Sequence, residues 1–126
     1  MNTIRYTDDH EWIRLESDGS ATVGITDHAQ DALGDIVFIE LPLVGDKFDA
    51  RIPVCVVESV KAAADVKMPV AGEVAQVNDA VADDPALVNT DPMGSGWFIR
   101  IKPANPADIE ALMDEAAYQA LLGRQP

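Results

Sequence analysis

One lysine lies between two apolar, β-prone runs, and its amine is the best candidate for chemistry in this sequence. The first run, Val54–Val57, precedes Glu58-Ser59-Val60-Lys61, and the second ends in Pro69-Val70-Ala71-Gly72-Glu73-Val74. This pattern predicts a hairpin with Lys61 at its tip. The small residues Ala62–Ala64 follow the lysine and leave room for an enzyme to reach it. Acylation would remove the charge of the amine and attach whatever chemistry the acyl group carries.

A lysine considered alone is usually a solvated surface charge. Spacing favours a special role for Lys61, because it lies eight residues before Pro69 and eleven before Gly72. This spacing is similar to that of lipoyl and biotinyl carrier domains. Val66-Lys67-Met68 superficially resembles the Met-Lys-Met of biotinyl domains, but Lys67 is only two residues before Pro69. We therefore predict that Lys67 is a solvent-facing strand residue and that Lys61 is the carrier site.

Composition bounds the possible partners. The 126 residues are enough for one domain with a buried core, and nine basic against twenty-two acidic residues give a formal net charge of −13. Such an excess of acid argues against nucleic acid and anionic membranes and favours basic faces on partner proteins. No apolar stretch approaches the length of a membrane span, and the N-terminus lacks a secretory core. If the sequence is complete, it predicts a cytoplasmic protein.

The remaining reactive side chains do not form a catalytic set. Cys55 is the single cysteine, which excludes an internal disulfide and a multi-cysteine metal site, and its apolar neighbours predict a buried, inert thiol. We expect His10 and His28 to make hydrogen bonds rather than to bind metal or act as bases. Gly94-Ser95-Gly96 lacks the rest of a phosphate-binding motif. The sequence therefore predicts neither an enzyme nor a metal site.

Short strands dominate the first hundred residues. Residues 11–15 and 21–25 predict a hairpin, and residues 36–41, 72–78 and 97–103 predict further strands. Thr26 or Asp27 is expected to cap a short helix that Gly34 ends. We expect residues 80–96 to form a long loop with one short helical turn. The pattern predicts a β core over about residues 4–103 and an amphipathic helical segment over about 106–122, which Asp114 could split by acting as a second cap.

The form of the lysine motif narrows the class of carrier. Glu58-Ser59-Val60-Lys61 is similar to the lysine motif of the glycine cleavage system H protein family, and other blocks match that family in order from about Tyr6 to Tyr118. These blocks are His10-Glu11-Trp12, Val23-Gly24-Ile25-Thr26-Asp27-His28-Ala29-Gln30, Ala32-Leu33-Gly34-Asp35, Val37-Phe38-Ile39-Glu40-Leu41-Pro42, Pro69-Val70-Ala71-Gly72-Glu73-Val74, Val88-Asn89 and Gly96-Trp97.

The resemblance implies a fold and a function. The fold would be a barrel-sandwich hybrid, mainly β with a C-terminal helix, in which two antiparallel sheets carry short flanking helices; residues 1–126 would form a single lipoyl-carrier domain. Lipoic acid would be joined to Lys61 by an amide bond. The arm would take aminomethyl from glycine decarboxylase to aminomethyltransferase, and dihydrolipoamide dehydrogenase would reoxidise it. The carrier itself, expected to be a monomer, would make and break no bonds.

The same resemblance gives roles to Glu11 and Asp65, and its position three residues before Lys61 gives Glu58 another. Glu11 and Asp65 would lie near the amino group of the loaded arm, which a carboxylate can hold by a charge-assisted hydrogen bond. The alternatives for them are a solvated strand end and a turn acid. Glu58 would help lipoylating enzymes to recognise the hairpin, with a plain surface acid as its alternative. Arg51 occupies a turn position where the family usually has glycine, at a cost of about 1 kcal/mol if its φ is positive.

Two other functions stay open at this level. A related protein could pass lipoyl groups from Lys61 to other carriers instead of using them for glycine. Alternatively, the chain could be an unmodified acidic binding module. The mass of the protein from its native cell separates the second alternative from a lipoyl carrier.

Overall fold

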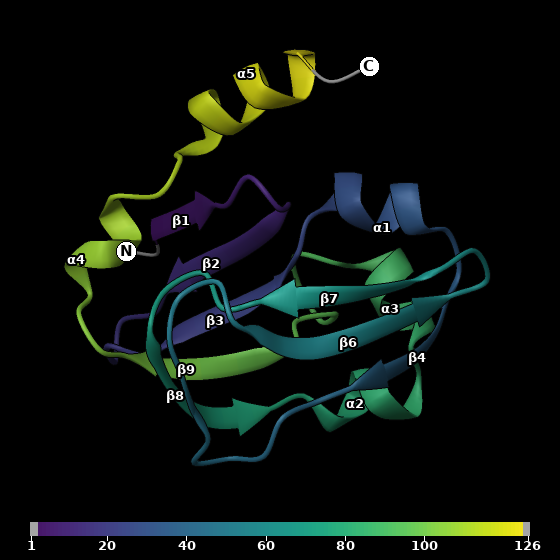
Figure 1. Ribbon diagram of the computed structural model, residues 1–126, viewed down its shortest axis with the longest axis horizontal. Coiled ribbons are helices and arrows are strands. Elements are labelled where there is room, and N and C mark those ends of the chain that lie inside the picture. Colours follow the sequence, from purple (N-terminus) through teal and green to yellow (C-terminus); the bar gives the residue numbers. More distant parts are fainter. Residues whose placement is uncertain (1–2, 125–126) are drawn as a thin grey trace.

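Two antiparallel sheets form the body of the protein in the computed structural model, which describes residues 3–124 (Figure 1). The larger sheet has the strand order β1-β2-β3-β9-β8-β5 and the smaller the order β4-β6-β7. The strands of the larger sheet are β1 (Thr3–Tyr6), β2 (Glu11–Leu15), β3 (Ala21–Ile25), β9 (Ile99–Pro103), β8 (Gly72–Val77) and β5 (Lys47–Phe48). Those of the smaller sheet are β4 (Ile36–Glu40), β6 (Pro53–Ser59) and β7 (Ala63–Lys67).

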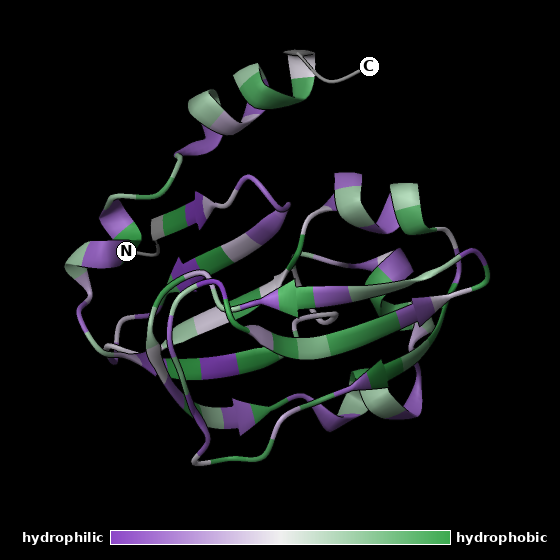
Figure 2. Cartoon of the chain, viewed as in Figure 1, coloured by the Kyte–Doolittle hydropathy of each residue, from purple (hydrophilic) through white to green (hydrophobic). Residues whose placement is uncertain are grey.

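The core lies between the two sheets, because one buried cluster takes side chains from both. It includes Ile13 and Val23 from the larger sheet and Ile39 and Val57 from the smaller. Figure 2 shows hydrophobic segments in the strands of both sheets, and β3 is buried along its whole length. The predicted mainly β fold of two antiparallel sheets is confirmed.

The predicted cap and stop of the first helix are confirmed. In α1 (Asp27–Leu33), the Thr26 hydroxyl is the N-cap and accepts a hydrogen bond from the Ala29 N–H (3.3 Å). Gly34 follows the helix with a φ of 80°, in the region that favours glycine. The chain can then turn directly into β4.

The expectation of a long loop with one helical turn at residues 80–96 is wrong. Two short helices, α2 (Asp79–Asp83) and α3 (Ala86–Thr90), lie in this segment and extend as far as Thr90. The Asn78 side chain caps α2, and Pro85 immediately precedes α3, where its fixed φ suits a helix start. Buried Val81 and Val88 fix both helices against the core, a tertiary contact that local propensity does not show.

The C-terminal segment is split as Asp114 suggested. It forms α4 (Ala107–Glu110) and α5 (Glu115–Arg124), and Asp114 Oδ1 accepts a hydrogen bond from the Ala117 N–H (2.9 Å). Between the helices, Met113 exchanges backbone hydrogen bonds with Tyr6 of β1. This bridge to the sheet is why the helix does not run unbroken from 106 to 122. In Figure 1, α5 lies above the sheets.

Candidate functional site

The lysine hairpin is formed by β6 and β7, which pair antiparallel with Glu58 opposite Ala63. Ser59 orders the turn between them. Its hydroxyl accepts hydrogen bonds from the Lys61 and Ala62 N–H groups, both at 3.1 Å, and its own N–H donates to the Ala62 carbonyl (2.8 Å). Lys61 is exposed in this turn, which lies at one end of the molecule beside α1 (Figure 1). The predicted placement of Lys61 at a hairpin tip therefore agrees with the structure.

The corner between α1 and β4 supports this turn. The Val60 N–H donates to the Asp35 carbonyl (3.0 Å). The Lys61 side chain also lies against Gly34, since a Cβ built on that glycine would be 3.3 Å from Lys61 Cε. The tip of the hairpin is thus fixed on both sides, by its own turn and by the corner.

Asn89 of α3 holds the corner in turn. Its Oδ1 accepts from the Ile36 N–H, and its Nδ2 donates to Gln30 Oε1 and to the Gly34 carbonyl, each at 2.9 Å. One amide side chain therefore links α1, the corner and β4. Val88-Asn89 is one of the blocks that match the family pattern, but no local pattern indicates this contact, because Asn89 lies 28 positions after Lys61 and the contact passes through three elements.

Asn89→Ala should loosen the hairpin without unfolding the protein. We expect a loss of about 1–3 kcal/mol, since the variant leaves the Ile36 N–H and the Gly34 carbonyl without this partner. Amide hydrogen exchange should quicken at Ile36 and Val60. Asn78→Ala is the matched control, because Asn78 Nδ2 similarly bonds two carbonyls, those of Ser95 and Trp97, which belong neither to the hairpin nor to its corner. Equal acceleration at Val60 in both variants would contradict the role of Asn89.

A second feature is a cleft of about 240 Å³ between β1, the end of β7 and the segment after α4. Glu11 lies in it and is only 3% exposed. Thr7 Oγ1 donates to Glu11 Oε1 (2.8 Å), and the Lys67 N–H donates to Oε2 (3.1 Å). Burial raises the pKa of the Glu11 carboxyl, although these hydrogen bonds oppose the rise. The alternative of a solvated strand end is wrong for Glu11. The cleft is lined by Tyr6, Thr7, Asp8, Asp9, Glu11, Arg51, Lys67, Ala111, Leu112 and Met113.

Two ion pairs flank Glu11. Lys67 Nζ lies 3.6 Å from Asp9 Oδ2, and Arg51 lies 3.7 Å from Asp8 Oδ1. Both cations of the cleft wall thus face other acids, and the Lys67 side chain is 41% exposed, as expected of a solvent-facing strand residue. Arg51 has a φ of 72°. Its φ is thus positive, and the expected backbone strain at this turn is about 1 kcal/mol.

Asp65 and Glu58 lie outside the cleft. Both are exposed, and Asp65 pairs with Val56 in the middle of the β6–β7 ladder. Residues two apart share one face of a strand, so Ala63, Asp65 and Lys67 form a row. This row spans about 13 Å from the hairpin turn to the cleft wall. Asp65 is thus not among the residues that line the cleft, and it lies on the row between the hairpin turn and Lys67 of the cleft wall.

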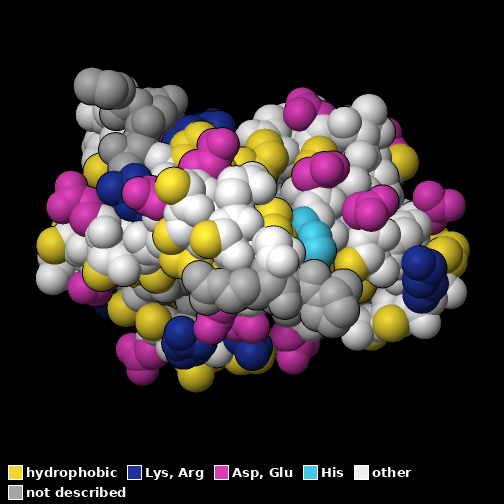
Figure 3. Space-filling model, turned by 90° about the horizontal axis from the view of Figure 1, so that it is seen from above, with side chains coloured by type: hydrophobic (Ala, Val, Ile, Leu, Met, Phe, Trp, Pro, Cys, Tyr) yellow, Lys and Arg dark blue, Asp and Glu magenta, His cyan; other side chains and the backbone are white. Residues whose placement is uncertain are grey.

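The remaining candidate residues, Cys55 and the two histidines, lie where packing or hydrogen bonding accounts for them. Burial raises the pKa of the Cys55 thiol to about 12, which agrees with an inert thiol. His10 Nδ1 is 2.8 Å from the Tyr118 hydroxyl, which also bonds Thr26 Oγ1 (2.7 Å). The His10 ring lies 4.5 Å from that of His28. Figure 3 views the molecule from above and shows an exposed histidine side chain with acidic side chains nearby. Within residues 3–124, no group of His, Cys, Asp or Glu could hold a metal ion.

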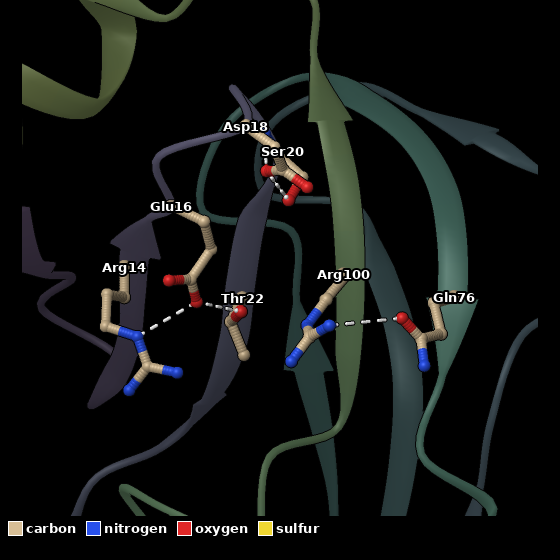
Figure 4. Close-up of polar contacts among 7 residues, drawn as sticks. All are labelled: Arg14, Glu16, Asp18, Ser20, Thr22, Gln76 and Arg100. Carbon is tan, nitrogen blue, oxygen red and sulfur yellow. Dashed lines mark hydrogen bonds and ion pairs between the residues drawn. The ribbon is translucent and has the colours of Figure 1, made fainter. Parts of the chain in front are cut away.

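A polar network on the larger sheet ties strands together away from the hairpin (Figure 4). Arg14 Nε and Thr22 Oγ1 both donate to Glu16 Oε2, at 3.0 and 2.5 Å. Burial opposes ionisation of Glu16, but these two hydrogen bonds outweigh it and lower the pKa. Arg100 of β9 likewise donates to Gln76 of β8 (3.3 Å). These contacts join neighbouring strands and bring no reactive group together.

Among the helices that the structure describes, none has the length and apolar character to cross a bilayer.

Comparison with known proteins gives one consistent family. A family model described as "Glycine cleavage H-protein" matches residues 4–125. The glycine cleavage system H protein of Halorhodospira halophila is 56% identical over 119 residues, which are 94% of this chain and 92% of that protein. The H protein of Chromobacterium violaceum is 58% identical over 120 residues, 95% and 94% of the two chains. A crystal structure of the H protein of Mycobacterium marinum has a TM-score of 0.88 at 39% identity and covers 95% of this chain and 96% of that one.

Proposed function

This chain belongs to the glycine cleavage H-protein family, the lipoyl carriers of the glycine cleavage system, and we propose that Lys61 is the residue that carries lipoic acid. The observation that carries the proposal is the geometry of the hairpin. Lys61 is exposed in a turn ordered by Ser59 and followed by small side chains. A lysine amine attacks an acyl donor only when it is neutral and accessible. The protein is a carrier, not an enzyme.

The arm on Lys61 would shuttle aminomethyl between enzymes. Glycine decarboxylase would load it, aminomethyltransferase would unload it to tetrahydrofolate, dihydrolipoamide dehydrogenase would reoxidise the dithiol, and a lipoylating enzyme would attach the group beforehand. The acidic charge of −13 suits transient docking on basic faces of these enzymes. We further propose that residues 1–126 act as one lipoyl-carrier domain and as a monomer. A cytoplasmic location stays a prediction.

The cleft at Glu11 would protect the loaded arm. An aminomethyl group on sulfur is open to hydrolysis, and a cleft that excludes water would slow it. Glu11 is already buried with two donors and could accept a further hydrogen bond from an ammonium. Asp65, exposed on the row between the hairpin turn and the cleft, would contact the arm on its way.

Tryptic mapping of the protein from its native cell tests the attachment. Acylated lysine resists trypsin, so we expect one peptide from Ile52 to Lys67 that carries the mass of a lipoyl group. Cleavage at Lys67 provides the internal control for protease access. Unmodified peptides that end at Lys61 would favour the acidic binding module instead. If the lipoylated protein does not support glycine cleavage but donates lipoyl groups to other carriers, the relay is the correct function.

A further inference from the structure

An exposed apolar patch adjoins the hairpin tip. It consists of Val37, Phe38 and Val60, which are 56%, 49% and 67% exposed. A β-bulge between Ile36 and Phe38 produces it, because the irregular register leaves the consecutive side chains Val37 and Phe38 both exposed while Ile36 and Ile39 stay buried. Bulges near functional sites commonly redirect side chains in this way. We call these three residues the tip patch.

The tip patch is close to Lys61 through strand pairing. Phe38 is opposite Glu58, three residues before the lysine. Val60 directly precedes Lys61, and its N–H bonds Asp35, two residues before Val37. Any protein that contacts the Lys61 amine closely therefore also meets the tip patch.

Acidic side chains surround the tip patch. Asp35, Glu40 and Glu58 are exposed on the same two strands and their flanks, and Asp65 lies across β6 from Glu40, both paired with Val56. An apolar centre with a charged rim is the usual anatomy of a protein interface. The complementary surface would be apolar at its centre and basic at its edge.

We infer that the tip patch docks the enzyme that acylates Lys61 with lipoate; this inference rests on the proposed lipoylation. Enzymes that act on the finished arm can reach its distal dithiol at a distance from the hairpin. The acylating enzyme has only the protein to bind, and must place Nζ against its acyl donor. There the neutral amine attacks the carbonyl of an activated lipoate such as lipoyl adenylate. A C–N bond forms, the bond to the phosphate leaving group breaks, and the amine loses a proton.

The test compares Phe38→Ser with Leu43→Ser in the unlipoylated protein. Leu43 is 74% exposed but lies beyond the other end of β4, so its substitution removes similar apolar surface away from the tip. With a lipoate ligase, ATP and lipoate, Phe38→Ser should raise KM for the carrier about tenfold and leave kcat unchanged. Leu43→Ser should match the wild type. The wild-type KM should also rise with salt, because the rim is charged. Thermal melting verifies that both variants are folded.

Three outcomes would overturn the inference. The first is a wild-type KM for Phe38→Ser. The second is an equal defect when the variant, lipoylated to completion beforehand, is assayed with glycine decarboxylase, since the tip patch would then serve that enzyme. The third is a wild-type dimer that Phe38→Ser dissociates, since a second copy would then cover the tip patch. Failure of the wild type to be lipoylated at Lys61 would instead defeat the proposed function, so the two failures are distinguishable.

Discussion

Lys61→Arg is expected to carry no lipoate and to give no glycine cleavage when the four-component system is reconstituted with it. Arginine keeps the positive charge and the reach of lysine, so the hairpin should fold as before. Its guanidinium, however, stays protonated at every relevant pH and is not a nucleophile for acyl transfer. Intact mass and NADH production measure the two effects. We expect complete loss of both, because the arm carries every intermediate.

Lys67→Arg is the matched control for this change. Lys67 is only six positions further along the same hairpin. Its backbone N–H, which bonds Glu11, is untouched by the substitution, and a guanidinium can still face Asp9. We therefore expect normal lipoylation and activity. A lipoyl increment on Lys61→Arg that disappears in Lys67→Arg would reverse the assignment of the carrier lysine.

Local pattern was enough to predict the parts of the site formed by neighbours in sequence. The hairpin needed only two apolar runs and a turn, and α1 needed only its Thr26 cap and Gly34 stop. In each case the interaction that fixes the structure spans a few residues. Ser59, for example, bonds backbone groups two and three positions ahead. Such contacts leave a signature in residue order, and the predictions that relied on them agree with the structure.

Contacts between distant segments left no comparable signature. The corner that holds the hairpin depends on Asn89, and α3 exists where a loop was expected because Val88 is buried in the core. Glu11 begins a strand, where a carboxylate is usually solvated. It is buried instead because the Lys67 N–H, 56 positions away, completes its hydrogen bonds. Burial therefore followed from the fold and could not be inferred from the motif alone.

Glu11→Gln is expected to shorten the life of the aminomethyl-loaded arm by about tenfold or more. A hydrogen bond to a charged group contributes about 1.5–3 kcal/mol, and each 1.4 kcal/mol is a factor of ten. Glutamine keeps the shape of the side chain, and its Oε1 can still accept one of the two existing hydrogen bonds. The measurement is the rate at which loaded carrier, freed from glycine decarboxylase, loses its aminomethyl group. Glu58→Gln, lipoylated beforehand and remote from the cleft, should lose it at the wild-type rate.

The pH dependence separates this role of Glu11 from a purely structural one. Burial raises the pKa of the carboxyl in the folded protein above its ordinary value of 4.5. As pH rises, the Glu11 carboxyl therefore ionises in the unfolded chain before it does so in the folded protein. Its contribution to stability is greatest at low pH and declines as pH rises through the interval between the unfolded pKa and the folded pKa. Retention of the aminomethyl group should change in the opposite sense, because only the carboxylate holds an ammonium.

Lowering the pH through that interval should therefore stabilise the fold through Glu11 while the loaded arm loses its group faster. In Glu11→Gln the contribution of this residue to both pH dependences should disappear, because glutamine does not titrate, while those of other acids such as Glu16 remain. Urea unfolding and the loss of aminomethyl, measured over the same pH series, test the two together. Retention of the aminomethyl group could instead decrease equally in the wild type and in Glu11→Gln as the pH is lowered. Acid would then act on the adduct itself, and Glu11 would not hold the amine. A third result is that Glu11→Gln changes the pH dependence of retention but not that of unfolding. Glu11 would then bind the amine, while its burial leaves the free energy of unfolding unaffected.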